Sequence, residues 1–353
     1  MRQLGRSMDL GFIYSHQCNI TCRHCGILSS PHNKNRMVHG DAERYIREAA
    51  ALRPLIGTIA FTGGEPFLFQ SEHLELIKLS SSLGLATRVV TNGFWAHDVE
   101  KATSTLSRFR EAGLREINFS ADVWHLEFLD PSLLRNALEA ARRLNYWRLV
   151  SYAMPDDSPP VAEFCRLYDI PEEEVVLYER NQFGRILADP RLREEYRERI
   201  FLIAGHVIGL GRAADHPSDL TFRAVEEYSR NACHEVNNKP VIYPNGDVYA
   251  CCCAGGRVEP FRVGNLHDST LSNLVYRMHG RIQFKFINCF GPREMYETAV
   301  RERPDIPRAE EYSSICEMCV KANEAITPLE MDQILTSRFA ELVISWLTSK
   351  DSA

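Results

Sequence analysis

The chain has 353 residues, of which 44% are hydrophobic and 25% charged, so it is long enough for one large domain and a smaller one. Its net charge of −6 argues against a nucleic-acid partner, because phosphate binding requires a positive surface. No stretch reaches 18 consecutive apolar residues and the first residues contain no signal-peptide core. We therefore expect no membrane span and a cytoplasmic location.

The first part of the chain alternates short apolar runs with helical patterns, which is typical of parallel βα units. Strands are predicted at residues 9–14, 55–61, 86–91, 116–120, 147–152 and 175–178. Helices are predicted between them, at 41–53, 72–83, about 99–109 and after Pro131. Six such units are too few for a closed eight-stranded barrel, so we expect an α/β fold with a partial, open (β/α)6 barrel.

The pattern changes beyond residue 178. A charged stretch over 190–207 is predicted to be helical, and Asn-Gly within residues 241–249 predicts a hairpin turn. A cysteine-rich region begins at about residue 231, and an amphipathic helix over about 328–348 closes the chain. The sequence therefore predicts two domains, residues 1–230 and 231–353.

Clustered cysteines are the most informative feature of the composition. The chain has 11, which in a reducing compartment favours metal ligands or redox groups over disulfides. Cys18, Cys22 and Cys25 form a CX3CX2C motif directly after the first strand. Such a loop can hold three of the four irons of a cubane cluster and leave the fourth open to a small molecule. The alternative is a zinc site that also uses His24, but zinc sites usually combine two separated ligand pairs.

Polar residues follow the next three predicted strands. The second strand ends in Gly63, Gly64, Glu65 and Pro66, the third in Thr91 and Asn92, and the fourth in Ser120 and Asp122. The carboxyl ends of parallel strands are where α/β folds bind their ligands, and these positions share one rim with the cysteines. An ordinary strand-to-helix turn is the alternative interpretation of the glycines.

Together these motifs resemble the radical S-adenosylmethionine (SAM) superfamily, with His24 where an aromatic residue is usual. The resemblance implies a [4Fe–4S] cluster on the three cysteines, with SAM chelating the open iron and being cleaved to a 5′-deoxyadenosyl radical that abstracts a substrate hydrogen. It implies that Gly63, Gly64, Glu65 and Pro66 bind the SAM amino group, and that Thr91, Asn92, Ser120 and Asp122 contact its ribose and carboxylate. Arg212 resembles an arginine near that carboxylate, and Arg185 is the competing candidate.

The C-terminal region resembles the opening of a SPASM domain. The resemblance rests on Cys233-X12-Gly246-X4-Cys251 and the following Gly264-Asn265-Leu266. Fewer cysteines follow than in the full pattern, so the shortened twitch form is expected. It implies one auxiliary [4Fe–4S] cluster held by Cys233, Cys251, Cys316 and Cys319, and a four-cysteine zinc knuckle is the alternative.

Four thiols remain outside these two sets. Cys165 lies on an apolar helical stripe and is predicted to belong to the core, and Cys252 or Cys253 can replace Cys251 as a ligand. A spare thiol that faces a substrate radical can instead return a hydrogen atom, which gives epimerisation. Cys289 is our first candidate for this catalytic role and Cys253 the second. His125 is either a base or a structural residue.

SPASM-type domains are associated with peptide substrates, so the resemblance implies maturation of a ribosomally made peptide natural product by epimerisation, cross-linking or oxidation. The alternatives are a small-molecule dehydrogenase or epimerase of aminocyclitol or aminoglycoside biosynthesis, and a zinc-stabilised binding protein. The cluster motif begins at residue 18 and leaves no room for an N-terminal leader-peptide-binding domain, so a separate recognition protein is expected. A flavodoxin- or ferredoxin-type donor would supply the electron.

Overall fold

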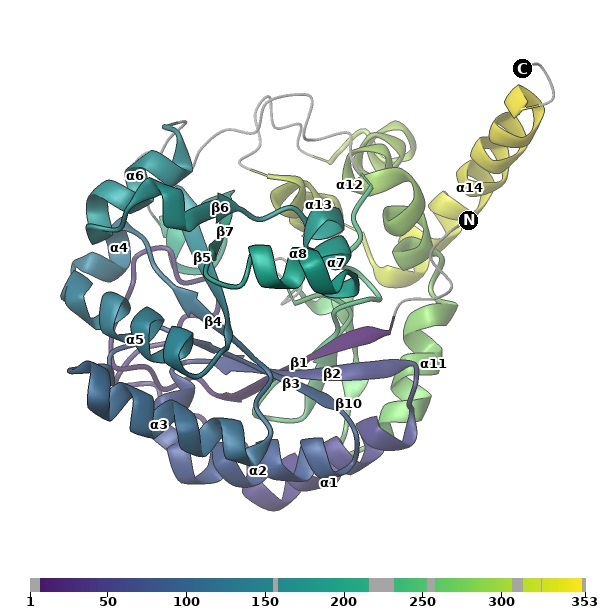
Figure 1. Ribbon diagram of the computed structural model, residues 1–353. Helices are drawn as coiled ribbons and strands as arrows, with labels where there is room; N and C mark the ends of the chain where they lie inside the picture. The colour runs from purple at the N-terminus through teal and green to yellow at the C-terminus, as the bar shows by residue number, and fades with distance from the viewer. Residues whose placement is uncertain are drawn as a thin grey trace.

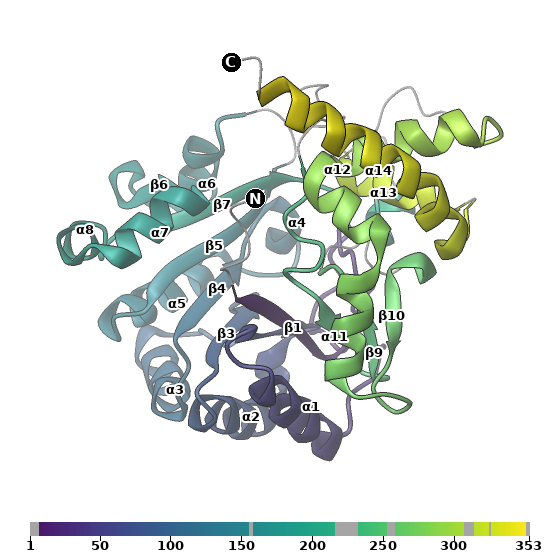
Figure 2. The same ribbon diagram turned by 90° about the vertical axis from the view of Figure 1, so that its right-hand side faces the viewer.

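The computed structural model describes residues 7–154, 158–215, 232–252, 258–306, 314–324 and 326–350. Its described strands form one sheet, in the order β10-β9-β8-β1-β2-β3-β4-β5-β7-β6 (Figure 1). Helices cover the outer face of the strands β1 to β5, and the C-terminal helices gather beside the other end of the sheet (Figure 2). None of the described helices is both long enough and apolar enough to cross a bilayer.

The N-terminal part is the expected open α/β barrel. Its parallel strands are β1 (Met8–Ser15), β2 (Ile56–Gly63), β3 (Ala86–Thr91), β4 (Glu116–Ser120), β5 (Trp147–Met154), β6 (Val175–Leu177) and β7 (Ile200–His206). The helices that alternate with them are α1 (His39–Ala51), α2 (Gln70–Ser82), α3 (Val99–Ala112), α5 (Pro131–Arg143) and α6 (Pro160–Tyr168). The predicted strands and helices of this part are confirmed, with shifts of a few residues at their ends.

Local sequence signals fix the ends of these helices. Asp98 caps α3 by accepting a hydrogen bond from the backbone N–H of Lys101, and Asp130 caps α5 in the same way. Gly84 follows α2 with a φ of +78°, the left-handed conformation that helix C-termini favour. Each helix therefore begins and ends where the chain must turn back toward the sheet.

One prediction for the middle of the chain is wrong. The stretch 190–207 is not one helix: it contains the short helix α8 (Pro190–Glu195) and then the strand β7, while α7 (Arg180–Ala188) precedes both. Residues 200–204 read Ile-Phe-Leu-Ile-Ala, a run typical of a buried strand, but the charged residues before it hide the change of pattern. Strand β7 lies between β5 and the short edge strand β6.

The C-terminal region continues the same sheet. Strands β8 (Val241–Ile242) and β9 (Asp247–Tyr249) form the predicted hairpin, β8 pairs in parallel with β1, and β10 (Arg262–Asn265) completes the edge. The C-terminal helices are α11 (Leu271–Gly280), α12 (Ile282–Glu302), α13 (Ile315–Glu324) and α14 (Pro328–Lys350). Helix α14 is the predicted closing helix, and α12 bends at Gly291, whose φ is 91°.

The barrel and the C-terminal helices share one hydrophobic core. It includes Phe12 and Phe61 of the barrel as well as Phe284 of α12 and Met331 of α14. The predicted domain boundary at residue 230 falls within residues 216–231, outside the described residues, and stays a prediction.

Candidate functional site

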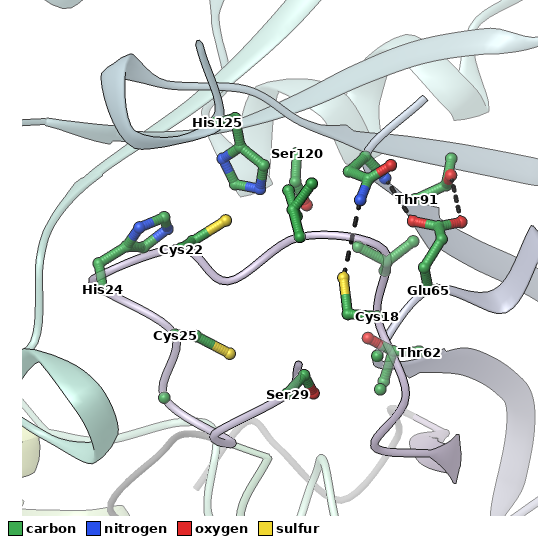
Figure 3. A pocket seen from close by; sticks show the side chains of 16 residues that line it. Cys18, Cys22, His24, Cys25, Ser29, Thr62, Glu65, Thr91, Ser120 and His125 are labelled. Carbon is green, nitrogen blue, oxygen red and sulfur yellow. Dashed lines mark hydrogen bonds between the residues drawn. The ribbon is translucent and has the colours of Figure 1, made fainter. Parts of the chain in front are cut away.

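A cavity of about 200 Å³ opens at the carboxyl ends of β1 to β4. Cys18, Cys22 and Cys25 line it, and Figure 3 shows their sulfur atoms pointing into the same space. All three thiols are free of disulfides; Cys18 and Cys22 are buried and Cys25 is partly exposed. The CX3CX2C loop thus presents three soft ligands to one enclosed volume.

Arg212 is one of the residues that hold the loop that carries these cysteines. This residue lies in a short 3-10 helix, Gly211–Asp215, and its backbone N–H donates to the carbonyl of Cys25 at 3.1 Å. Its guanidinium donates to the carbonyl oxygens of Cys22 and Ser29. Arg212 therefore lies beside the cysteines, but its side chain is hydrogen-bonded to the loop and is not among the residues that line the cavity, so its contact with the SAM carboxylate stays a prediction. Arg185, the competing candidate, is exposed on α7.

Gly63, the last residue of β2, and Gly64 allow the chain to pass very close to the cysteine loop. Gly63 has a φ of +126°, and a Cβ on Gly64 would lie 1.9 Å from the carbonyl oxygen of Gln17. The N–H of Gly64 donates to Ser15 and that of Glu65 to Gln17. Both glycines line the cavity, so only residues without a side chain leave room here for both the loop and a ligand. The next residue, Pro66, is buried and begins the 3-10 helix Pro66–Phe69.

Glu65 is a buried carboxylate at the centre of the strand ends. Its Oε1 accepts hydrogen bonds from the hydroxyl of Thr91 at 2.7 Å and from the N–H of Phe67 at 3.0 Å, and its Oε2 accepts from the N–H of Asn92 at 2.8 Å. Burial raises the pKa of Glu65 to about 7 against the opposing effect of these donors. The hydroxyl of Thr91 also accepts from the indole of Trp95, so it is committed to the protein, whereas Oε2 retains capacity for another donor.

Asn92 joins the third strand to the cysteine loop. Its Nδ2 donates to Oδ1 of Asn19 at 2.9 Å and lies 3.8 Å from Sγ of Cys18, the contact drawn in Figure 3. Its Oδ1 accepts from the N–H of Phe94. Burial raises the pKa of the Cys18 thiol to about 12. This thiol is therefore protonated until a metal displaces its proton.

Asp122, which follows β4, is the shared acceptor of a second buried hydrogen-bond network. It caps the short helix α4 (Val123–Leu126), and its Oδ1 accepts from the N–H groups of Trp124 and His125 and from Nδ1 of His125, the last at 2.8 Å. Its Oδ2 lies 3.3 Å from Nε2 of His24. These bonds hold the pKa of Asp122 below its usual range although burial opposes them.

His125 lines the first cavity together with Cys22. Burial alone would lower its pKa, but the carboxylate of Asp122 outweighs burial and raises the pKa of His125 to about 10. The sequence predicted separate roles for His24, Asp122 and His125 and did not predict that they form one network. The spacing of Asp122 and His125, three residues apart after a strand, was the available signal.

A second cavity, of about 270 Å³, adjoins the first at the carboxyl ends of β4, β5 and β7. The two cavities share His24, Ser120 and His125. The second is lined further by Tyr152, His206 and small residues, namely Ala153, Ala204 and Gly205. The sequence did not predict this cavity, because the stretch that contains β7 is predicted to be helical.

Ser29 was also missed. It lines the first cavity, its side chain is buried, and its hydroxyl has no hydrogen-bond partner among the described residues. A buried hydroxyl without a partner is costly unless a ligand completes its hydrogen bonds. No sequence motif marks this position.

The four cysteines predicted to hold an auxiliary cluster lie on three separate segments, and these ligands stay a prediction. The N–H of Cys233 donates to the carbonyl of Ile287 on α12, and Cys251 follows β9. Cys316 and Cys319 lie on α13, which packs against α12. Cys251 and Cys319 are buried.

The remaining thiols differ in their surroundings. Cys165 is buried in α6, as predicted for a core residue. Cys289 is exposed on α12 and lines neither cavity, and burial of part of its side chain raises its pKa. Cys252 is exposed, and Cys253 lies outside the described residues.

Comparisons with known proteins match both halves of the chain. Residues 12–152 match the radical SAM superfamily, and residues 233–298 match SPASM, an iron–sulfur cluster-binding domain. A protein of Bacillus subtilis (strain 168) named "Putative peptide biosynthesis protein YydG" is 31% identical over 130 residues, which are 36% of this chain. The match spans only 40% of that relative's length.

Solved structures share the fold over almost the whole chain. The structure of native anSMEcpe with bound AdoMet has a TM-score of 0.52 at 16% identity, and covers 95% of this chain and 98% of its own. The structure of native anSMEcpe with AdoMet and the Cp18Cys peptide has a TM-score of 0.51 at 17% identity, and covers 96% and 99%.

The residues of the first cavity suit the cofactors of this superfamily. Three free thiols are the ligands that iron–sulfur clusters prefer, and the adjoining carboxylate, amide and unpartnered hydroxyl suit the polar end of a small molecule. The two family matches and this geometry agree. The chain belongs to the radical SAM superfamily and carries a C-terminal SPASM domain, and it is therefore an enzyme that uses a [4Fe–4S] cluster, SAM and auxiliary iron–sulfur chemistry.

Proposed function

We propose that this enzyme matures a ribosomally made peptide by abstracting a hydrogen atom from one of its residues. The observation that carries the proposal is the pair of adjoining cavities on one rim, one with the three cysteines and one without. A reactive group in the first cavity would meet a substrate residue in the second. The peptide biosynthesis name of the Bacillus relative supports the peptide as substrate class.

In this proposal Cys18, Cys22 and Cys25 hold the cluster, and SAM occupies the rest of the first cavity. Together these cofactors supply the radical when bound. The free capacity of Glu65 Oε2 would accept the SAM ammonium, and Thr91 would keep that carboxylate in place. Asn92 and the hydroxyl of Ser29 would complete the polar contacts.

The second cavity would take the substrate. Its small residues Ala153, Ala204 and Gly205 leave room at the ends of β5 and β7, and His206 and Tyr152 supply polar edges. Because Ser120 lines both cavities, it lies where the ligand and the substrate would meet. This arrangement would hold one substrate residue near the first cavity and exclude water from it.

The outcome of the reaction depends on the fate of the substrate radical. A thiol that returns a hydrogen atom gives epimerisation, for which Cys289 and Cys253 are our candidates, whereas an auxiliary cluster on Cys233, Cys251, Cys316 and Cys319 can accept an electron and give oxidation or a cross-link. The same proposal includes an electron donor of the flavodoxin or ferredoxin type, a separate protein that binds the leader peptide, and a cytoplasmic location. The alternative is a small-molecule dehydrogenase or epimerase of aminocyclitol or aminoglycoside biosynthesis.

The test uses anaerobically reconstituted enzyme, SAM and dithionite in deuterated water. It is incubated with synthetic peptides encoded beside its gene and, separately, with aminocyclitols. A peptide product with one solvent deuterium and an unchanged sequence indicates epimerisation, and a product lighter by two hydrogen atoms indicates oxidation or cross-linking. Turnover of an aminocyclitol with every peptide left unmodified would contradict the proposal. A variant with all three motif cysteines changed to Ala is the control.

A further inference from the structure

One wall of the second cavity is formed by the ends of β5 and β7. The two strands lie side by side (Figure 2), with Ala153 opposite Gly205. Two residues earlier, Ser151 is opposite Ile203. Because side chains alternate between the two faces of a strand, these four positions share one face of the sheet. Ser120 of β4 is opposite Ser151 and lines both cavities, so this face runs from the first cavity into the second.

Gly205 is the position where this wall is most open. A Cβ built on Gly205 meets no atom of the described residues within 4 Å, and its backbone is the extended chain of a strand, which any residue can adopt. At Gly64, by contrast, a Cβ would collide with backbone. The fold therefore does not require glycine at position 205. A glycine inside a strand often marks a place where a ligand or another backbone approaches closely.

The wall is mostly apolar. The residues of β5 and β7 that line it include four small or aliphatic ones, namely Ala153, Ile203, Ala204 and Gly205. The hydroxyl of Ser151 already donates to an amide oxygen on β4, at 3.1 Å. Tyr152 and His206 are the polar residues that complete this part of the lining. Burying a charge against such a surface is costly unless a partner of opposite charge is present, so the wall favours an uncharged, apolar group.

The carboxylate on the other side of the cavity is already engaged through both of its oxygens. Oδ1 of Asp122 lies 2.8 Å from Nδ1 of His125, and Oδ2 lies 3.3 Å from Nε2 of His24. Asp122 is 2% exposed, so a substrate ammonium or guanidinium would have to displace these partners. Among the described residues that line the cavity, Asp122 is the one carboxylate. The lining therefore disfavours a cationic substrate residue.

We propose that Gly205 and Ala153 determine the size of the substrate residue, and that the second cavity takes a residue whose side chain is apolar and larger than that of Ala. The proposal rests on the proposed function, which places the substrate in this cavity. The missing side chain at Gly205 leaves the space that the substrate side chain fills. Contact with the wall then holds the reactive carbon toward Ser120, where the two cavities meet.

The test uses anaerobically reconstituted full-length enzyme with SAM, dithionite and the encoded peptide that the wild type modifies. Two further synthetic peptides carry Ala or Lys in place of the modified residue, and substrate-dependent 5′-deoxyadenosine formation gives kcat/KM for each. The wild type should use the Lys peptide at least about tenfold less well than the native one. In Gly205→Val, the added methyl groups would occupy the space of the substrate side chain. The ratio of kcat/KM for the native peptide to that for the Ala peptide should therefore fall about tenfold or more.

Two further variants make the result specific. Gly205→Ala adds a single methyl group and should shift the same ratio by a smaller factor. Gly40→Val makes the larger change in α1, where a Cβ also meets no described atom within 4 Å, and Gly40 lines neither cavity. This control should keep the wild-type ratio. Iron content, measured for every variant, shows whether the barrel has folded and bound its cluster.

An unchanged ratio in Gly205→Val with full iron would overturn the proposal. A native modified residue no larger than Ala, or equal use of the Lys peptide, would also overturn it. If Gly205→Val loses its iron, Gly205→Ala decides, and an unchanged ratio there contradicts the proposal. In each of these cases the wild type still modifies a peptide, so the proposed function stands. Wild-type enzyme that modifies no peptide would instead refute both.

Discussion

The two cysteine sets of this protein are built in opposite ways. In the barrel, Cys18, Cys22 and Cys25 share one loop, and their sulfurs face one cavity. In the C-terminal region, the predicted ligands are spread from Cys233 to Cys319 on separate segments, of which Cys233 and helix α13 contact α12. The first set is thus specified by local sequence, and the second by tertiary structure.

The supports of the two sets differ as well. Other parts of the barrel hold the motif loop by direct hydrogen bonds, from Arg212 to its carbonyls and from Asn92 toward Cys18. The C-terminal set depends on the shared hydrophobic core, which Cys251 and Cys319 enter and Cys233 touches. We expect substitutions in the barrel set to abolish SAM cleavage directly. Substitutions in the C-terminal set should remove the auxiliary cluster and also disturb the packing of the hydrophobic core.

The largest effect should come from changing Cys18, Cys22 and Cys25 together to Ala. This removes every protein ligand proposed for the barrel cluster, so iron should fall to about half of the wild-type content and SAM cleavage should cease. Iron analysis and chromatography of 5′-deoxyadenosine measure both. Continued 5′-deoxyadenosine formation would place the SAM-cleaving cluster elsewhere.

Changing Cys316 and Cys319 together to Ala should distinguish the role of the C-terminal cysteines from that of the barrel cysteines. The auxiliary cluster would be lost, with about half of the iron, while SAM cleavage without substrate continues because the barrel site is intact. Cys165→Ala is the matched control, since it removes a buried thiol that belongs to neither set. Full iron in the double variant would contradict the predicted auxiliary ligands.

Much of this architecture could be predicted from local patterns. The strands at 86–91 and 116–120 have the predicted bounds, and the barrel cysteines converge as their spacing suggests. What could not be predicted depends on contacts between distant residues. Arg212 bonds to Cys22 across 190 positions of sequence and leaves no local signal, and the charged residues before β7 obscure the apolar run of that strand.

Glu65→Gln should weaken SAM binding while iron stays constant. A neutral amide cannot attract the SAM ammonium, and loss of a buried charged hydrogen bond of about 1.5–3 kcal/mol predicts a loss of affinity of roughly tenfold to a hundredfold. Because the pKa of Glu65 is raised to about 7, wild-type affinity should fall as the pH decreases through 7 and the carboxylate takes up a proton. Calorimetry at pH values on both sides of 7 tests this, and Glu65→Gln should lack that dependence.

Arg212→Ala should loosen the motif loop without removing a ligand. The carbonyl oxygen of Ser29 would lose its donor, at a cost of about 1–3 kcal/mol for a buried group left unpaired, whereas the carbonyl oxygen of Cys22 would keep the N–H of Cys25. We expect lower iron retention by the barrel cluster during dilution with a chelator. Arg185→Ala, on the exposed face of α7, is the matched control and should behave as wild type. Equal iron retention in both variants would show that the motif loop keeps its conformation without Arg212.

Cys289→Ser should have the smallest effect on the cofactors and the most selective effect on the product. Cys289 is exposed and lies outside both cysteine sets, so its loss should change neither iron content nor SAM cleavage. If it donates a hydrogen atom, product with solvent deuterium should disappear, while 5′-deoxyadenosine still forms with substrate because abstraction precedes donation. Since Cys289 lines neither cavity, this role requires the bound substrate or the C-terminal helices to bring the thiol to the radical. Cys253→Ser provides the comparison: loss of deuterated product in that variant alone would transfer the role to Cys253, and normal product in both would favour electron transfer to the auxiliary cluster.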